Sequence, residues 1–195
     1  MSNYKFLTLI ISFLSLICFT FKAYAITENQ YLVINKLINE ENIDKAFSDL
    51  KLMQKDEAKL SARSQILIGK IYLSLEQPAK AFTFFEKATF TSVSNYDLAY
   101  AGMSMAAIKL GNLSDAKNYA EKALKENPDL VDAKLALGLV FADYGQMKKA
   151  EIHFKKAILA SRNSLVSVRA YASSKFRQGR NKEARNIITN ALIEQ

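Results

Sequence analysis

Two pairs of serine and lysine residues have a spacing that could support catalysis. Ser48 with Lys51, and Ser114 with Lys117, form Ser-x-x-Lys strings, in which the serine hydroxyl could act as the nucleophile of an acyl-enzyme. Enzymes of that kind also carry a Lys-Thr-Gly string, which this sequence lacks. Both strings fall inside, or at the start of, segments that we expect to be helices. We therefore interpret them as ordinary helix positions.

Two further residues, Ser104 and His153, are candidates for chemistry. Residues 102–106 read Gly-Met-Ser-Met-Ala, which approaches a Gly-x-Ser-x-Gly nucleophile elbow but lacks the final glycine. His153 is the only histidine, and neither a cysteine nor a regular spacing of carboxylates accompanies it. The sequence also has no glycine-rich phosphate loop and no nucleic-acid-binding module. We expect no enzyme activity, no cofactor, no metal, no small-molecule substrate and no nucleic acid partner.

Residues 1–25 have the pattern of a secretory signal peptide. Lys5 precedes an apolar run over residues 6–21, and residues 23–25 read Ala-Tyr-Ala, which supplies small side chains for a signal peptidase. The run is shorter than the about 20 residues that span a bilayer as a helix, so we expect cleavage after Ala25 and export to the bacterial periplasm. An uncleaved inner-membrane anchor is the alternative. A lipoprotein signal has a small residue immediately before its cysteine. The single cysteine, Cys18, follows Ile17, which argues against lipidation.

Charge is distributed unevenly along the chain behind this leader. Residues 26–60 hold five basic and seven acidic residues, whereas residues 131–195 hold twelve basic and five acidic residues. A basic end can steer acidic partners, anionic lipid or nucleic acid, but basic helices are often simply solvated. We prefer the solvated interpretation, so charge alone selects no partner.

The segment after residue 26 repeats at intervals of 34 or 35 residues. The repeat is clearest in five alanines: Ala46, Ala81, Ala116, Ala150 and Ala184. Four residues after each alanine come Leu50, Phe85, Ala120, Phe154 or Ile188, and seven residues after come Met53, Ala88, Ala123, Ala157 or Ala191. Spacings of four and seven place these side chains on one face of a helix.

A second helix is expected before each of these alanine helices. Twelve residues before each alanine lies a mostly small residue, and the residue three positions later is aromatic in two of the five units, at Tyr72 and Phe141. Short turn-like segments, such as Gly111-Asn112 and Gly145-Gln146, separate the two helices. Each repeat is therefore predicted to be a helical hairpin. The units lie near residues 27–60, 62–95, 97–130, 131–164 and 165–195.

These units resemble the tetratricopeptide repeat family, whose unit combines a small residue, an aromatic, a turn glycine and a second helix with alanines. The fourth unit fits best, through Gly138, Phe141, Gly145, Ala150, Phe154 and Ala157. The resemblance covers residues 26–195 and implies an all-α, right-handed α-solenoid of about five helix-turn-helix units. Ile34 and Lys175 depart from the pattern in the first and last units, as terminal units often do.

The first helix of each unit is expected to form the inner, concave face of such a solenoid. The fifth and ninth positions of the units predict the groove residues: Tyr31, Asn35, Ile66, Lys70, Ala101, Met105, Leu135, Leu139, Arg169 and Ser173. An apolar middle suits an amphipathic helix or an extended apolar peptide, and Lys70 and Arg169 could meet its carboxylates. The alternative is that the apolar members only fill contacts between repeats.

The resemblance implies a non-catalytic scaffold that binds protein or peptide segments, similar to the exported bacterial repeat proteins of pilus, secretion and envelope assembly. With an uncleaved leader, the protein would instead be an assembly or chaperone factor anchored to the inner membrane. A third possibility is a self-associating structural protein, because incompletely capped end repeats expose helix faces that could stack.

Overall fold

The computed structural model describes residues 28–53, 60–91, 96–162 and 164–193. The predicted leader, residues 1–25, lies outside this described part. All regular secondary structure in the described residues is α-helical: α2 (Glu28–Asn39), α3 (Ile43–Met53), α4 (Ala62–Ser74), α5 (Pro78–Thr91), α6 (Tyr96–Lys109), α7 (Leu113–Glu126), α8 (Val131–Asp143), α9 (Met147–Ala160), α10 (Leu165–Arg177) and α11 (Asn181–Ile193).

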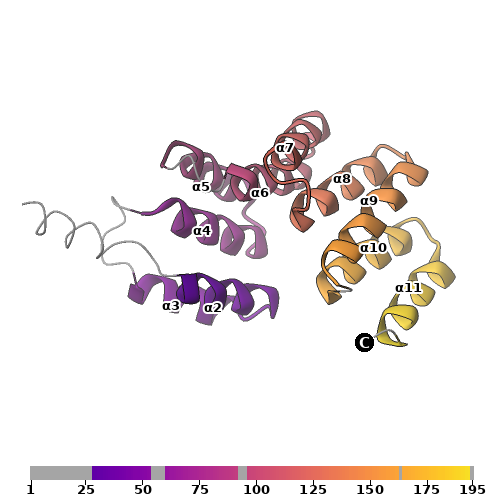
Figure 1. Ribbon diagram of the computed structural model, residues 1–195, viewed down its shortest axis with the longest axis horizontal. Helices are drawn as coiled ribbons and strands as arrows, with labels where there is room; N and C mark the ends of the chain where they lie inside the picture. The colour runs from indigo at the N-terminus through magenta and orange to yellow at the C-terminus, as the bar shows by residue number, and fades with distance from the viewer. Residues whose placement is uncertain (1–27, 54–59, 92–95, 163, 194–195) are drawn as a thin grey trace, which may run out of the picture.

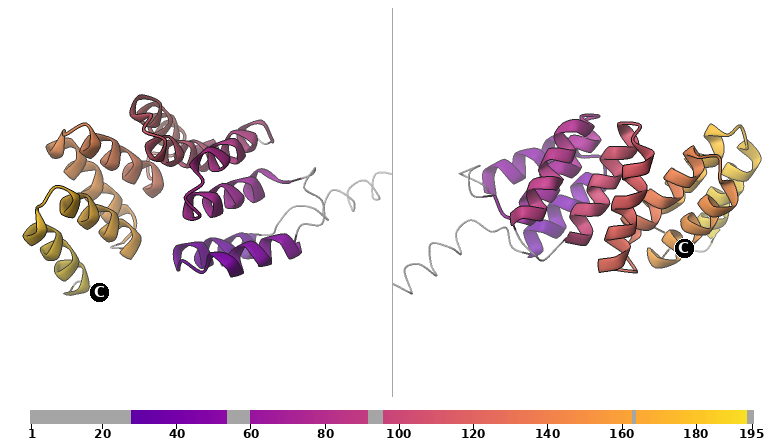
Figure 2. Two further views of the ribbon diagram at one scale, coloured as in Figure 1. Left: turned by 180° about the vertical axis from the view of Figure 1, so that it is seen from behind. Right: turned by 90° about the horizontal axis from the view of Figure 1, so that it is seen from above.

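The helices pair into five consecutive hairpins, from α2–α3 to α10–α11. Figure 1 shows these hairpins following one another along an arch, with the first hairpin (indigo) and the last (yellow) both on its lower side. The views from behind and from above show the same order (Figure 2). The predicted all-α repeat solenoid is confirmed. The hairpins lie in the predicted units, except that α6 begins at Tyr96, one residue before the third unit.

Each hairpin turn contains a residue with a left-handed backbone. In the last three hairpins this residue is Gly111, Gly145 or Gly179, with φ values of 81°, 73° and 74°. Glu41 and Glu76 adopt the same region in the first two hairpins, with φ values of 61° and 54°. Glycine reaches this region without the steric cost of a Cβ atom, so the turn glycines fit their positions and the two glutamates carry that cost.

Aromatic rings pack directly on glycine backbone between the helices. A Cβ atom at Gly102 would lie 2.3 Å from Cε1 of Phe85, and one at Gly69 would lie 2.7 Å from the same atom. Phe154 has the same relationship to Gly138, at 2.8 Å. These distances are too short for a real Cβ atom, so the small residues of the repeat are needed for close approach. Phe85 thereby holds α4, α5 and α6 together.

The alanines that reveal the repeat are buried without exception: Ala46, Ala81, Ala116, Ala150 and Ala184. Ser104, at the small-residue position of the third hairpin, is also fully buried. Its Oγ atom donates a hydrogen bond of 2.7 Å to the carbonyl oxygen of Ala116, on the second helix of the same hairpin. The hydroxyl of Ser104 therefore joins two helices and is not available as a nucleophile.

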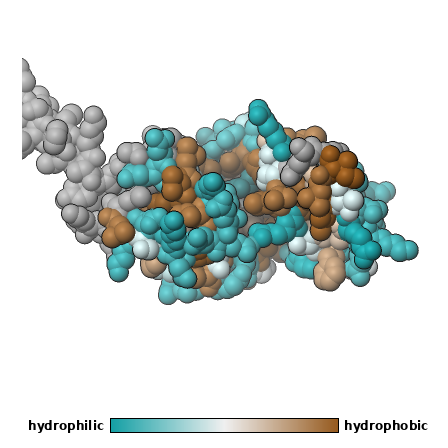
Figure 3. All heavy atoms as spheres, turned by 90° about the horizontal axis from the view of Figure 1, so that it is seen from below, coloured by the Kyte–Doolittle hydropathy of each residue, from teal (hydrophilic) through white to brown (hydrophobic). Residues whose placement is uncertain are grey.

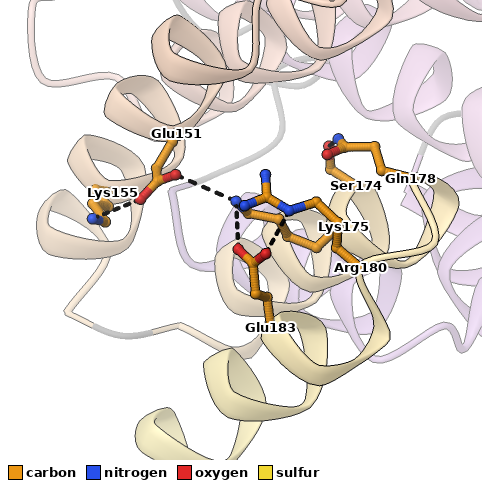
Figure 4. Close-up of polar contacts among 7 residues, drawn as sticks. All are labelled: Glu151, Lys155, Ser174, Lys175, Gln178, Arg180 and Glu183. Atoms are coloured by element: carbon orange, nitrogen blue, oxygen red, sulfur yellow. Dashed lines mark hydrogen bonds and ion pairs between the residues drawn. The ribbon is translucent and has the colours of Figure 1, made fainter.

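Lys175 joins the last three helices through charge (Figure 4). It takes the position that Tyr72 and Phe141 hold in other hairpins, yet its side chain is only 4% exposed. Its Nζ atom donates hydrogen bonds to Oε2 of Glu151 on α9, at 3.3 Å, and to Oε2 of Glu183 on α11, at 3.1 Å. A buried ammonium group is tolerated when carboxylates pair with it. Two carboxylates thus compensate for the missing aromatic ring.

The same cluster shifts the acidity of its carboxylates. A hydrogen bond from Lys155, together with the contacts of Lys175, lowers the pKa of Glu151 to about 2, although burial acts in the opposite direction. Hydrogen bonds from Lys175 and Arg180 likewise lower the pKa of Glu183. Both carboxylates therefore stay ionised at neutral pH and keep Lys175 paired.

Candidate functional site

A cavity of about 430 Å³ lies between the first helices of the hairpins. Each of α2, α4, α6, α8 and α10 contributes to its lining, together with the connections after α7 and after α9. Among the described residues, none from a second helix of a hairpin lines it. The concave face predicted from the register is therefore where the cavity forms.

The lining combines polar and apolar side chains. Its amide and charged members are Asn35, Asn39, Lys70, Asn127, Asp129 and Asp132. Its larger apolar members are Tyr31, Leu98, Leu130, Val131, Leu135 and Val166. Ser161, Ser164 and Ser167 complete the side formed by the α9–α10 connection and α10. Such a mixture suits a polypeptide, whose backbone needs hydrogen bonds and whose side chains need apolar contacts.

The cavity brings together four of the predicted groove residues: Tyr31, Asn35, Lys70 and Leu135. Ile66 is fully buried in a cluster with Phe85, so it fills the contact between hairpins, which was the alternative interpretation. Met105 and Leu139 are half-buried and pack against neighbouring core clusters. Arg169 and Ser173 are exposed on α10 and, like Ala101, which is buried, lie outside the lining.

Sequence reasoning missed lining residues on both sides of the predicted stripe. Leu98, Asp132 and Val166 take the second position of their units, and Asn39 takes the thirteenth position of the first unit. These positions continue the fifth and ninth positions in steps of three or four residues, which is the spacing of one helix face. Extending the register by one turn in each direction would have found all four residues.

Lys70 connects three hairpins across the cavity. Its Nζ atom donates a hydrogen bond of 3.0 Å to Oδ1 of Asn35 on α2, and it lies 3.3 Å from Oδ2 of Asp132 on α8. The side chain of Lys70 is 19% exposed and that of Asp132 is 42% exposed. The pair therefore stands at the boundary between core and solvent, where ion pairs are screened less than on an open surface.

Two opposing effects set the acidity of Lys70. Burial acts to lower its pKa, but attraction to Asp132 and the hydrogen bond with it outweigh burial, so the pKa of Lys70 is raised. Lys70 is therefore protonated at neutral pH, and its charge is already balanced by a carboxylate of the same chain.

A second ion pair links the first hairpin to the last. Arg169 on α10 pairs with Glu41, the left-handed residue in the turn between α2 and α3. Both side chains are mostly exposed, so the pair is worth at most about 1 kcal/mol. The sequence suggested that Lys70 and Arg169 could meet the carboxylates of a partner. In the structure, Lys70 already pairs with Asp132, and Arg169 already pairs with Glu41.

The connection between α7 and α8 is fixed by side-chain hydrogen bonds. Nδ2 of Asn127 donates to Oδ2 of Asp97 on α6, at 3.0 Å, and Oδ1 of Asn127 accepts from the backbone N–H of Asp129, at 3.1 Å. Lys134 donates to Oδ1 of Asp129 at 3.0 Å. Side-chain hydrogen bonds therefore hold this wall of the cavity in one conformation.

Three of the candidates for chemistry, Ser104, Lys117 and His153, make structural contacts in the described part of the chain. In the second Ser-x-x-Lys string, Lys117 pairs with Glu121. His153 stacks on Phe141 with ring centroids 5.3 Å apart, and burial lowers its pKa. Within the described ranges no group of three or more histidine, cysteine or acidic side chains could hold a metal ion. The described helices also include none with the length and hydropathy of a membrane span.

The surface seen from below, where the arch opens, is mixed. Hydrophobic and hydrophilic residues are interspersed across it (Figure 3).

Comparison with known families gives two matches. Models described as tetratricopeptide repeat match residues 62–89 and residues 102–164. These ranges cover the second hairpin up to Thr89, and most of the third and fourth hairpins.

Comparison with solved structures finds the same architecture. A thermophilic TPR protein of Thermus thermophilus has 21% sequence identity and a TM-score of 0.70, covering 86% of this chain and 90% of that chain. The pilF protein of Pseudomonas aeruginosa has 15% identity and a TM-score of 0.57, covering 86% and 76%. MamA of Desulfovibrio magneticus has 16% identity and a TM-score of 0.52, covering 86% and 93%. At these identities the likeness concerns the fold.

Proposed function

Because the chain is a protein of the tetratricopeptide repeat family, we propose that it is a non-catalytic scaffold that binds a segment of a partner protein in the cavity between its first helices. The repeat fold supports a role in protein–protein interaction, since proteins of this architecture generally act through their surfaces.

The cavity is the observation that carries this proposal. Its volume of about 430 Å³ accommodates a few side chains of a peptide, and its lining comes from all five hairpins. Asparagine side chains can donate to and accept from a peptide backbone, while Leu98, Leu135 and Val166 provide apolar contacts. An extended segment, or one face of an amphipathic helix, fits this combination.

Photo-crosslinking tests the proposal directly. A crosslinking amino acid at Val166, in the cavity lining, should capture a defined partner segment in cells, which mass spectrometry then identifies. The same amino acid at Leu159, on α9 and 77% exposed, is the control because Leu159 lies outside the lining. Equal products from both positions, or none from Val166, would contradict binding in the cavity.

We further propose that the protein works in the bacterial periplasm, in the assembly of pili, secretion systems or other envelope structures. The support is the leader pattern of residues 1–25, with Lys5, the apolar run and the small residues before Ile26. Mass spectrometry of the protein purified from cells should find Ile26 as the first residue. An intact N-terminus would instead favour an assembly or chaperone factor anchored to the inner membrane.

A further inference from the structure

The last hairpin leaves uncovered an apolar side chain that every earlier hairpin buries. Ile188 on α11 takes the register position that Leu50, Phe85, Ala120 and Phe154 hold in the first four hairpins. Those four residues are at most 2% exposed, because the next hairpin packs on them, whereas Ile188 is 46% exposed. On the same helix Ala184 and Ala191 are buried, but Leu192, like Ile188, is exposed.

Phe176 on α10 extends this uncovered surface. Of its equivalents in the earlier hairpins, Ile38 and Ala142 are buried and share core clusters with residues of the next hairpin, whereas Leu73 and Ile108 are half-buried. Phe176 itself is 65% exposed. We call Phe176, Ile188 and Leu192 the C-terminal face. It is the surface on which a sixth hairpin would pack.

The first hairpin has the matching surface at the other end of the arch. Leu32 on α2 is equivalent to Leu67 and Ala136, and Val33 is equivalent to Met103, Leu137 and Tyr171. These five equivalents are buried and share core clusters with the preceding hairpin, whereas two further equivalents, Ala170 and Ile68, are half-buried. Leu32 and Val33 are both more than half exposed. We call these two residues the N-terminal face.

The junctions inside the chain show how the two faces would fit. Leu50 of the first hairpin and Leu67 of the second belong to one buried cluster. At the same register positions, the C-terminal face offers Ile188 and the N-terminal face offers Leu32, which are also aliphatic. A junction between two copies would therefore repeat a contact that the chain already makes.

Charge complements the apolar match. Phe82 on α5 meets Tyr119 on α7 of the next hairpin, with ring centroids 5.8 Å apart. The equivalent residues at the two ends are Arg185 on α11 and Asp49 on α3, so stacking would place a guanidinium group beside a carboxylate. The excess of acidic residues in segment 26–60 and of basic residues in segment 131–195 acts in the same direction.

We propose that the protein self-associates head to tail, with the C-terminal face of one copy packed on the N-terminal face of a second copy. The two faces differ, so the contact is heterologous. A stack of any length leaves one N-terminal face and one C-terminal face free, at its two ends. The solenoid of one chain is then continued by the next. This inference is independent of ligand binding in the cavity.

A charged residue, Lys36, lies one helical turn after Leu32 and Val33, beside the N-terminal face. Lys36 stands where Ile71, Ala106 and Val140 are fully buried in the inner hairpins, and it pairs with Glu40 on its own helix. Its aliphatic stem can lie along the apolar face while the ammonium group remains in water. Lys36 therefore weakens the junction and makes association depend on concentration. Replacing it with an apolar residue, in Lys36→Ile, should strengthen association.

Analytical ultracentrifugation of the purified protein tests the proposal. The wild-type protein should gain mass steadily with concentration, and Leu32→Asp and Ile188→Asp should each remain monomeric. Because each variant retains one intact face, a mixture of the two should form a complex of two copies. Leu159→Asp, which replaces an exposed apolar residue outside both faces, is the control and should associate as the wild type does. Circular dichroism confirms that every variant is folded.

Charge reversal at the junction provides a second test. Arg185→Asp alone and Asp49→Arg alone should weaken association, and the chain that carries both substitutions should recover it. A wild-type monomer at every concentration would overturn the proposal. So would a Leu32→Asp variant that still forms dimers, because that result would indicate pairing of two C-terminal faces.

Discussion

The Nζ atom of Lys70 lies 3.3 Å from Oδ2 of Asp132, so an ion pair joins the second hairpin to the fourth across the cavity. Removing the carboxylate leaves a mostly buried ammonium group without a neutralising charge, although its hydrogen bond to Asn35 remains. We expect Asp132→Asn to lower the free energy of unfolding by about 1–2 kcal/mol in urea denaturation. Glu121→Gln, which breaks the more exposed pair of Glu121 with Lys117, is the control and should change it little. Equal effects would argue against a structural role for the Lys70 pair.

Gly102 is predicted to tolerate no side chain. A Cβ atom there would meet the ring of Phe85 at 2.3 Å, so Gly102→Ala should overpack the contact and cost about 1–3 kcal/mol in thermal or urea unfolding. Phe85→Leu removes the ring and should make the second substitution less harmful. The double variant should therefore be more stable than the sum of the two single effects predicts. Simple additivity would contradict the contact.

Acid should weaken the contact between α9 and α10 through Glu151. The pKa of Glu151 falls from 4.5 to about 2 because Lys155 and Lys175 hydrogen-bond to its ionised form. Since the folded-state pKa is lowered, this contribution to stability is complete above pH 4.5 and is lost as the pH falls toward 2. Urea midpoints measured across that range should fall more steeply for the wild type than for Glu151→Gln. If the urea midpoints of the two proteins fell equally with pH, the ion pairs of Glu151 would not contribute to stability.

His153 is predicted to be replaceable. Its ring stacks on Phe141, and its Nδ1 atom is buried with no hydrogen-bond partner in the described part of the chain. His153→Phe should raise the free energy of unfolding by about 1 kcal/mol, because it removes an unsatisfied polar atom. A fall in stability would contradict this account.

The same substitution should change the pH profile. Burial lowers the pKa of His153, so the wild type loses stability as the pH falls below 6.5 and the unfolded chain takes up a proton first. This loss of stability should be absent in His153→Phe. Chemical denaturation above and below pH 6.5 measures the free energy of unfolding of both proteins.

The sequence was sufficient for the hairpins because their signal is local. The alanine register depends on helix periodicity and on close packing between neighbouring helices. Each of the five alanines, from Ala46 to Ala184, is buried at the same position of its hairpin. The cavity depends instead on the curvature of the whole arch, which accumulates over five hairpins. The register therefore identified Tyr31, Asn35, Lys70 and Leu135, but it placed Ile66 in the groove, although the structure buries that residue.

Pairing between distant hairpins was the part that the sequence did not reveal. No local pattern joins Lys70 to Asp132 or Arg169 to Glu41, because each pair spans several units. From the sequence, Lys175 was interpreted only as a departure from the repeat pattern in the last unit. Its burial depends on two carboxylates supplied by the helices before and after it, and only the packed structure shows them together.

The tether between Lys70 and Asp132 bears on which ligands the cavity prefers. A carboxylate that belongs to the same chain competes at a high effective concentration with any that arrives from solution. An aspartate, a glutamate or a C-terminal carboxylate of a partner would have to displace Asp132 before it could form an ion pair with Lys70. For the proposed partner segment, we therefore expect no preference for a carboxylate at the position where a lone lysine would attract one.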